Sequence, residues 1–128
     1  MLWWTEELRT GIDTIDIQHR SIFNKANEIF DLGSQSKAED IEKIFIFLMN
    51  YANNHFFEEE VLMIENSYED FINHRRKHNY FIEEIYRIYQ NIKEENSEEN
   101  LNELKVLIIE WLANHISGDD KKFISILD

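Results

Sequence analysis

Apolar residues recur at spacings of three and four along most of the chain, which is typical of helices with one buried face. Short polar stretches that contain serine interrupt this pattern at residues 33–36, 66–67 and 94–97. Such stretches end one helix and begin the next. The sequence therefore predicts four helices, over roughly residues 17–32, 37–64, 68–93 and 98–116.

Long amphipathic helices joined by short connections favour antiparallel neighbours. We therefore predict an all-α fold, an antiparallel up-down-up-down four-helix bundle, in a single domain over residues 1–128. Residues 1–16 are expected to form an extended N-terminal arm with a turn at Gly11, and residues 117–128 a C-terminal turn and tail. The apolar residues expected to pack the arm along the bundle are Trp3, Trp4, Ile12 and Ile15.

Two serines are candidates to cap the helices that follow them. Ser36 with Glu39 fits a capping box, and Ser67 with Asp70 resembles one. A serine oxygen accepts a hydrogen bond from a free amide at the helix start, and the acid lies near the positive end of the helix. Both helices are therefore expected to begin directly after their serine.

Composition narrows the possible partners and metal ligands. The net charge of −13 disfavours binding to nucleic acid or to an anionic membrane surface. There is no apolar run of the roughly 20 residues that span a bilayer, so we expect a cytoplasmic protein. Because the chain has no cysteine, any metal must be bound through nitrogen and oxygen, hence by His, Asp and Glu.

All five histidines fall on the apolar stripes of the predicted helices: His19, His55, His74, His78 and His115. A lone histidine on such a stripe is most often a hydrogen-bonded core residue. If roughly three positions in seven face the core, however, five independently placed histidines would all face inward only about once or twice in a hundred cases. Chance placement is therefore a poor explanation for this group.

The histidines are also predicted to lie at one level of the bundle. Counted from the second connection, Glu59 and His74 lie seven and eight residues away, or about 11 Å along their helices. The same count pairs His19 with His55 across the first connection, within about one turn. His78 and His115 likewise lie at similar distances from the third connection. One slab of the bundle should therefore contain all five.

Within that slab, His55 pairs with Glu59 and His74 with His78 at helical spacing, so each pair can chelate. A five-residue offset from His115 to the second acid of Asp119-Asp120 is not an α-helical spacing, so a turn at Gly118 is expected to return a carboxylate to the site. Five imidazoles and two carboxylates exceed the needs of one tetrahedral zinc and suit two metals bridged by carboxylates. The neighbouring acids Glu58, Glu60 and Asp119 are the alternative registers.

These motifs resemble the hemerythrin family, in particular its single-domain bacterial members, over essentially the whole chain. The resemblance rests on four segments: residues 4–19, the run His55-Phe56-Phe57-Glu58-Glu59 through Met63, His74-x-x-x-His78, and Trp111 through His115 to Phe123. The resemblance implies that His74, His78 and His115 bind one iron and that His19 and His55 bind the other. It also implies that Glu59 and Asp120 bridge the two irons.

The cofactors implied are two non-haem Fe ions with an oxo or hydroxo bridge, and dioxygen bound end-on at the iron with one protein ligand fewer. Leu112 would help to wall the dioxygen pocket, together with a dry surround of Phe23, Phe56, Phe81, Ile108 and Trp111. Leu112 is equally well explained as an ordinary core residue.

The function expected is reversible dioxygen binding by a carrier, store or sensor that is not an enzyme. The alternatives are a di-iron enzyme acting on peroxide or nitric oxide, iron storage, and a plain helical interaction domain. Spectra and iron content discriminate among them. The sequence identifies no protein partner.

Overall fold

The computed structural model describes residues 4–125, and all of its regular elements are helical. Two of its four long helical rods change from α to π geometry along their length. The elements are η1 (Glu6–Leu8), α1 (Asp13–Phe30), α2 (Ala38–Tyr51) continued by the π segment η2 (Ala52–Phe56) and by α3 (Phe57–Glu65), α4 (Phe71–Glu94), and α5 (Glu98–Glu110) continued by the π segment η3 (Trp111–Asp120) and by α6 (Lys121–Ile124).

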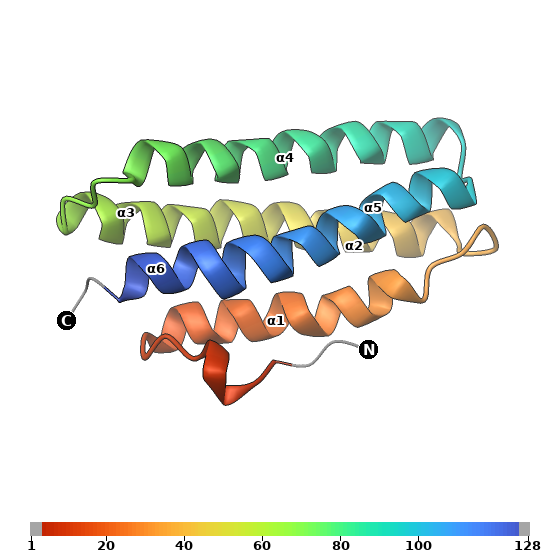
Figure 1. Cartoon of the computed structure of the whole chain (residues 1–128). Helices are drawn as coiled ribbons and strands as arrows, with labels where there is room; N and C mark the ends of the chain where they lie inside the picture. Colours follow the sequence, from red (N-terminus) through yellow and green to blue (C-terminus); the bar gives the residue numbers. More distant parts are fainter. Residues whose placement is uncertain (1–3, 126–128) are drawn as a thin grey trace.

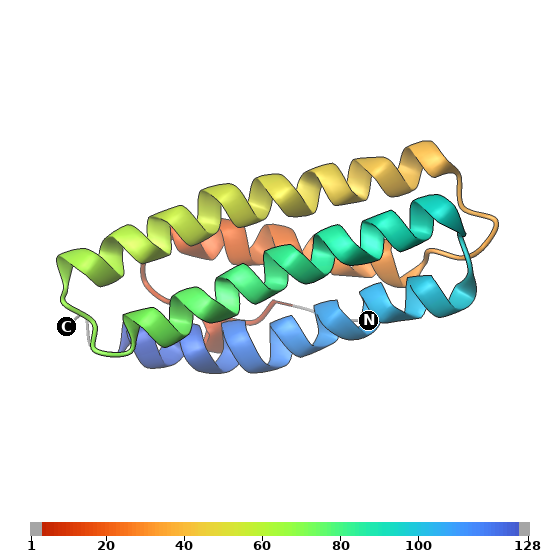
Figure 2. The same ribbon diagram turned by 90° about the horizontal axis from the view of Figure 1, so that it is seen from above.

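The four rods run antiparallel to their neighbours, as Figures 1 and 2 show. The main contacts join α1 to α2, α2 to α4, α4 to α5 and α5 back to α1, so α2 lies diagonally opposite α5. The predicted up-down-up-down bundle is therefore confirmed. Within residues 4–125, no helix is both long and apolar enough to cross a membrane.

Each rod contributes apolar residues to one shared core. Fully buried examples, one per rod, are Ile22, Leu48, Phe81 and Ile108. Burying a side chain of this kind stabilises the fold by about 1.5–3 kcal/mol before entropy is counted. The apolar residues spaced three and four apart thus form the core as expected. Polar residues on the same helix faces are also buried inside the bundle.

The first helix begins at Asp13, four residues earlier than predicted, so the arm is shorter than expected. The reason is Asp16, which lies in the first turn of α1. Its carboxylate accepts hydrogen bonds from the Thr10 amide and hydroxyl, each at 2.8 Å, and from the Gly11 amide at 3.3 Å. Gly11 has φ +86°, the left-handed conformation expected of a turn. Trp4 packs against the core, whereas Trp3 lies outside the described residues.

The two predicted capping boxes are wrong. The residues that precede α2 and α4 are Lys37 and Asp70, and neither side chain caps its helix. Ser36 instead accepts a hydrogen bond from the Gly33 amide within the connection, and Ser67 adopts a positive φ of 51°. A serine side chain that bonds within a turn is not available to a helix start.

The predicted turn at Gly118 is also wrong. The last rod does not end at residue 116 but continues through η3 and α6 to Ile124. A π segment has i→i+5 hydrogen bonds and therefore more residues per turn than an α-helix. A five-residue offset, which an α-helix would place on different faces, then lies close to one full turn. Asp120 comes beneath His115 without any break in the helix.

We expect Gly118→Ala to raise the free energy of unfolding by about 0.5–1 kcal/mol, because alanine restricts the unfolded chain and favours helix. A Cβ at Gly118 would meet nothing within 4 Å. The matched control is Gly11→Ala, which places alanine at φ +86° and should lower that free energy by about 1 kcal/mol. Urea unfolding measures both. A destabilised Gly118→Ala variant would contradict the continuous helix.

Candidate metal centre

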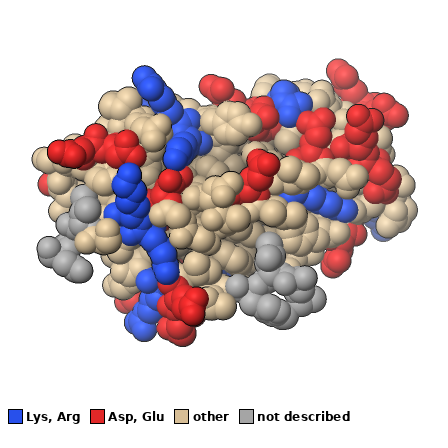
Figure 3. Space-filling view, viewed as in Figure 1, with Lys and Arg blue, Asp and Glu red and all other residues tan. Residues whose placement is uncertain are grey.

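Seven polar side chains are buried together at one end of the bundle. Of the other charged residues that the structure describes, only Asp16 is also buried, and Figure 3 shows many charged side chains on one face of the molecule. The buried seven are at most 3% exposed, and they are the seven residues singled out in the sequence: His19, His55, Glu59, His74, His78, His115 and Asp120. Burial of so many ionisable groups is costly unless they are paired or bind metal.

All four rods contribute to this cluster. His19 lies on α1, His55 on η2 with Glu59 one turn later on α3, and two histidines lie on α4. The last rod contributes His115 and Asp120, both from η3. The two π segments therefore occur where the second and fourth rods present their polar groups, in agreement with the frequent occurrence of π geometry at functional sites.

The atoms form two groups that share the same two carboxylates. Within each group the candidate ligand atoms all lie within 4.8 Å of one another. The first consists of Glu59, His74, His78, His115 and Asp120, and the second of His19, His55, Glu59 and Asp120. Because both carboxylates belong to both groups, the arrangement is suited to two adjacent metal ions.

The imidazole nitrogens point at one another and at the carboxylates. The Nε2 atoms of His19 and His55 are 3.1 Å apart, as are those of His78 and His115. Asp120 Oδ1 lies 3.0 Å from His74 Nε2. Yet both oxygens of Glu59 and both of Asp120 make no hydrogen bond to any described residue. Cations between these four buried carboxylate oxygens and the imidazole nitrogens would satisfy both, so the donor set fits a metal site.

Three further side chains hold the imidazoles from outside. Glu60 Oε2 lies 3.0 Å from His78 Nδ1, and Gln18 Oε1 lies 2.6 Å from His55 Nδ1. Asp119 Oδ2 lies 3.4 Å from the Nδ1 atom of His115. Acceptance of the Nδ1 proton leaves Nε2 free to face the centre, an arrangement typical of metal-binding histidines.

Helical spacing offers Glu60 and Asp119 only as alternative ligand registers, and it does not identify Gln18 as a partner of the cluster. Their common signal is that each directly precedes or follows a residue of the cluster: Gln18 beside His19, Glu60 beside Glu59. Gln18 and Glu60 support an imidazole on a neighbouring rod. That cross-pairing depends on how the rods pack and cannot be read from spacing along one helix. Glu58, the third alternative, belongs to neither group.

Aromatic rings cover the inner side of the cluster. His78 stacks on Phe56 with ring centroids 3.9 Å apart, and His115 stacks on Trp111 at the same distance. The residues expected to form a dry surround are all at most 8% exposed: Phe23, Phe56, Phe81, Ile108, Trp111 and Leu112. Leu112 is buried, and it lies three residues before His115 in the sequence. Its role as a wall of the dioxygen pocket stays a prediction.

In the metal-free protein the cluster lowers the pKa of its two acids and raises the pKa of two of its histidines. Burial alone would raise the pKa of Asp120, but His115 and His19 outweigh it and keep that pKa well below its usual value. Burial alone would lower the pKa of His74, but Asp120 and Glu59 raise it to about 9. The same carboxylates raise the pKa of His115. Protons therefore take the place that metal ions would occupy.

This predicts a pH dependence for the metal-free protein. A histidine whose pKa rises from 6.5 to about 9 on folding stabilises the fold fully below pH 6.5, and this contribution is lost as the pH rises toward 9. The melting temperature of the metal-free form should therefore fall between pH 6.5 and 9. The metal-loaded form should not show this fall, because metal binding displaces the proton. Melting curves of both forms at pH 6, 7, 8 and 9 test this. An equal fall of the melting temperature with pH in the two forms would contradict it.

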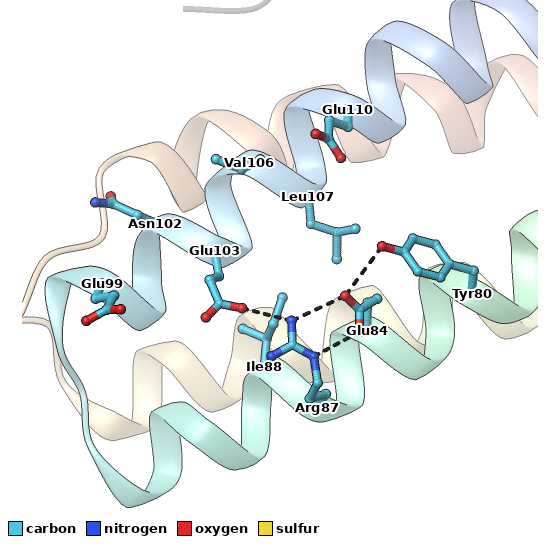
Figure 4. Close-up of a pocket in the computed structure, with 10 residues that line it drawn as sticks. All are labelled: Tyr80, Glu84, Arg87, Ile88, Glu99, Asn102, Glu103, Val106, Leu107 and Glu110. Carbon is cyan, nitrogen blue, oxygen red and sulfur yellow. Dashed lines mark hydrogen bonds and ion pairs between the residues drawn. The ribbon is translucent and has the colours of Figure 1, made fainter.

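A second hollow has none of these properties. Figure 4 shows a surface groove of about 350 Å³ between α4 and α5. Its guanidinium, from Arg87, is already paired with Glu84 at 2.9 Å and with Glu103 at 2.8 Å. These side chains are 24–47% exposed, so their charges are hydrated and satisfied. Among the described residues, the buried carboxylate and imidazole atoms without a hydrogen-bond partner all lie in the histidine cluster.

Comparison with known proteins agrees with this cluster. The sequence matches the Hemerythrin HHE cation binding domain family over residues 10–127. It is 33% identical over 125 residues to a bacteriohemerythrin of Stenotrophomonas maltophilia, covering 96% of this chain and 79% of that protein. A bacteriohemerythrin of Clostridium acetobutylicum is 31% identical over 130 residues (97% and 99% covered), and a myohemerythrin of Theromyzon tessulatum is 32% identical over 120 (94% and 88%). The chain therefore belongs to the hemerythrin family.

Proposed function

We propose that this protein binds dioxygen reversibly at a di-iron centre and that it acts as an oxygen carrier, store or sensor rather than as an enzyme. The observation that carries the proposal is the pair of overlapping ligand groups that share Glu59 and Asp120. In this proposal His74, His78 and His115 bind one iron, and His19 and His55 bind the other. The two carboxylates bridge the irons.

The number of candidate ligands supports octahedral metals. The first group offers five side chains, three histidines and two carboxylates, whereas a tetrahedral zinc binds four ligands. This favours an octahedral ion such as iron at that position.

The unequal number of histidines supports an open coordination position. The first group offers three imidazoles and the second offers two, while both share the same two carboxylates. When bound, a pair of ferrous ions would supply the two electrons that reversible dioxygen binding requires. The buried aromatic rings beside the cluster would exclude water from that position.

The test is optical. Protein purified without oxygen and reduced should gain a charge-transfer band in air and lose it again under inert gas. A band that forms once and never reverses would contradict reversible binding. The enzyme alternative predicts steady turnover of hydrogen peroxide or nitric oxide above the rate of an equal amount of free iron.

A further inference from the structure

Two aromatic residues beside the centre carry buried polar atoms that have no partner. Tyr51 is the last residue of α2, and Trp111 is the first residue of η3. Each is 6% exposed. Within residues 4–125, the Tyr51 hydroxyl and the Trp111 Nε1 make no hydrogen bond. A buried donor without an acceptor is rare and needs an explanation.

Their positions bring these polar ends to the inner side of the cluster. Tyr51 and Trp111 each lie four residues before a histidine of the cluster, on rods that are diagonally opposite and run in the same direction (Figure 1). Four residues correspond to about 6 Å along the bundle. Both side chains therefore form one layer directly beside the cluster, toward the middle of the bundle.

Ring contacts fix both residues in this layer. Tyr51 stacks on His55 with centroids 5.0 Å apart and an interplanar angle of 21°, and Trp111 stacks on His115 at 3.9 Å and 13°. Burial raises the pKa of the Tyr51 hydroxyl well above its usual value, and the nearby Trp111 side chain opposes that rise. Both rings also contact Phe56, with centroids 5.9 Å from Tyr51 and 5.3 Å from Trp111, so the two residues share one neighbour in this layer.

The donor inventory leaves one proton without an acceptor. An indole N–H only donates, whereas a phenol donates one hydrogen bond and accepts up to two. If Trp111 donates to the Tyr51 oxygen, the Tyr51 proton still needs an acceptor. The neighbouring rings of Phe56 and Phe81 offer none. Among the described residues, the structure gives the Tyr51 proton no acceptor.

We propose that the Tyr51 hydroxyl donates a hydrogen bond to the small ligand bound at the centre and that the Trp111 N–H fixes the direction of this hydroxyl. The ring of Tyr51 covers His55, which belongs to the ligand group with only two histidines, where an added ligand would bind. The inference deepens the proposed function when the ligand is dioxygen. It applies equally to azide, a small anion that accepts hydrogen bonds.

The test compares Tyr51→Phe with the unchanged protein in two assays. We expect azide to bind the oxidised iron-loaded variant roughly tenfold more weakly, and dioxygen to dissociate from the reduced variant roughly tenfold faster, because a hydrogen bond to a charged acceptor is lost. The infrared stretching band of bound azide should shift between H₂O and D₂O in the unchanged protein and not in the variant.

A matched control and a stability measurement separate ligand binding from structure. Tyr89→Phe removes a hydroxyl from a half-buried tyrosine that packs on Phe45, about 16 Å along α4 from His78, and should leave both rates unchanged. In the metal-free protein, Tyr51→Phe should leave the melting temperature unchanged or raise it, because the hydroxyl has no partner there.

The outcomes are distinct. Weaker azide binding with a solvent-dependent azide band supports the inference, even if no reversible band forms in air, a result that would overturn only the proposed oxygen binding. Equal azide affinity and equal dioxygen release in both proteins would overturn the inference and leave the function standing. A lower melting temperature with unchanged ligand binding would assign the hydroxyl a structural role and also overturn it.

Discussion

Replacing Glu59 with glutamine is expected to reduce the iron content from two ions per chain to one or none. The amide has the same shape but lacks the charge that lets one side chain bridge two cations. Both carboxylate oxygens of Glu59 are buried and make no hydrogen bond to a described residue, and of the described acids only Asp120 also belongs to both ligand groups. The other bridging acid, Asp120, cannot hold both ions alone.

The neighbouring glutamates provide a graded series for this experiment. Glu60→Gln weakens the support of His78 Nδ1, so metal affinity should fall by roughly 10- to 100-fold while two sites remain. Glu58→Gln lies outside both ligand groups and should leave iron content and affinity unchanged. Elemental analysis after anaerobic purification and a chelator competition measure the series. The same iron content in all three variants would contradict the role of Glu59.

Removal of both metals is expected to lower the melting temperature of the protein by roughly 15 °C. A ligand that binds only the folded state, at a free concentration 1,000 times its Kd, stabilises that state by about 4 kcal/mol. For a domain of this size, 1 kcal/mol corresponds to roughly 4 °C. Without metal, the buried carboxylates of Glu59 and Asp120 lose the cations between them and face only imidazole side chains.

Calorimetry before and after dialysis against a chelator at pH 7 measures this effect. Reloading with ferrous iron under inert gas should restore the original melting temperature, whereas magnesium, which prefers oxygen ligands, should not. A melting temperature that is the same with and without metal would show that the polar cluster is stable by itself.

The helical pattern was sufficient to predict the bundle, because each rod has one apolar stripe and its ends are marked by short polar connections. Details at the ends were not predictable in the same way. Whether Ser36 caps α2 or bonds to the Gly33 amide within the preceding turn depends on the conformation of the connection, which the helical pattern does not specify. The early start of α1 depends on Asp16, whose bonds to residues 10 and 11 form only once the arm has folded back.

For the site, helical spacing correctly brought the histidines to one level, because four of the seven groups are in i, i+4 pairs. Asp120 was placed correctly for the wrong reason. Its five-residue offset from His115 indicated a turn at Gly118, whereas the structure has a π segment. The sequence carries no simple signal for that geometry, since glycine fits both interpretations.

Residues that act across the bundle were the hardest to predict. Gln18 contacts His55 on the neighbouring rod, and Tyr51 shares the ring of Phe56 with Trp111 of the diagonal rod. Both contacts require the relative rotation of two helices, which spacing within one helix does not contain. Tyr51 also looks like an ordinary aromatic core residue until the missing partner of its hydroxyl is known.

The most direct test of the metal centre is anomalous diffraction at the iron absorption edge, from crystals of anaerobically purified protein. We expect two peaks about 3.5–4 Å apart, both between the carboxylates of Glu59 and Asp120, with three histidines at one peak and two at the other. A single peak, or peaks anywhere else in the molecule, would contradict it.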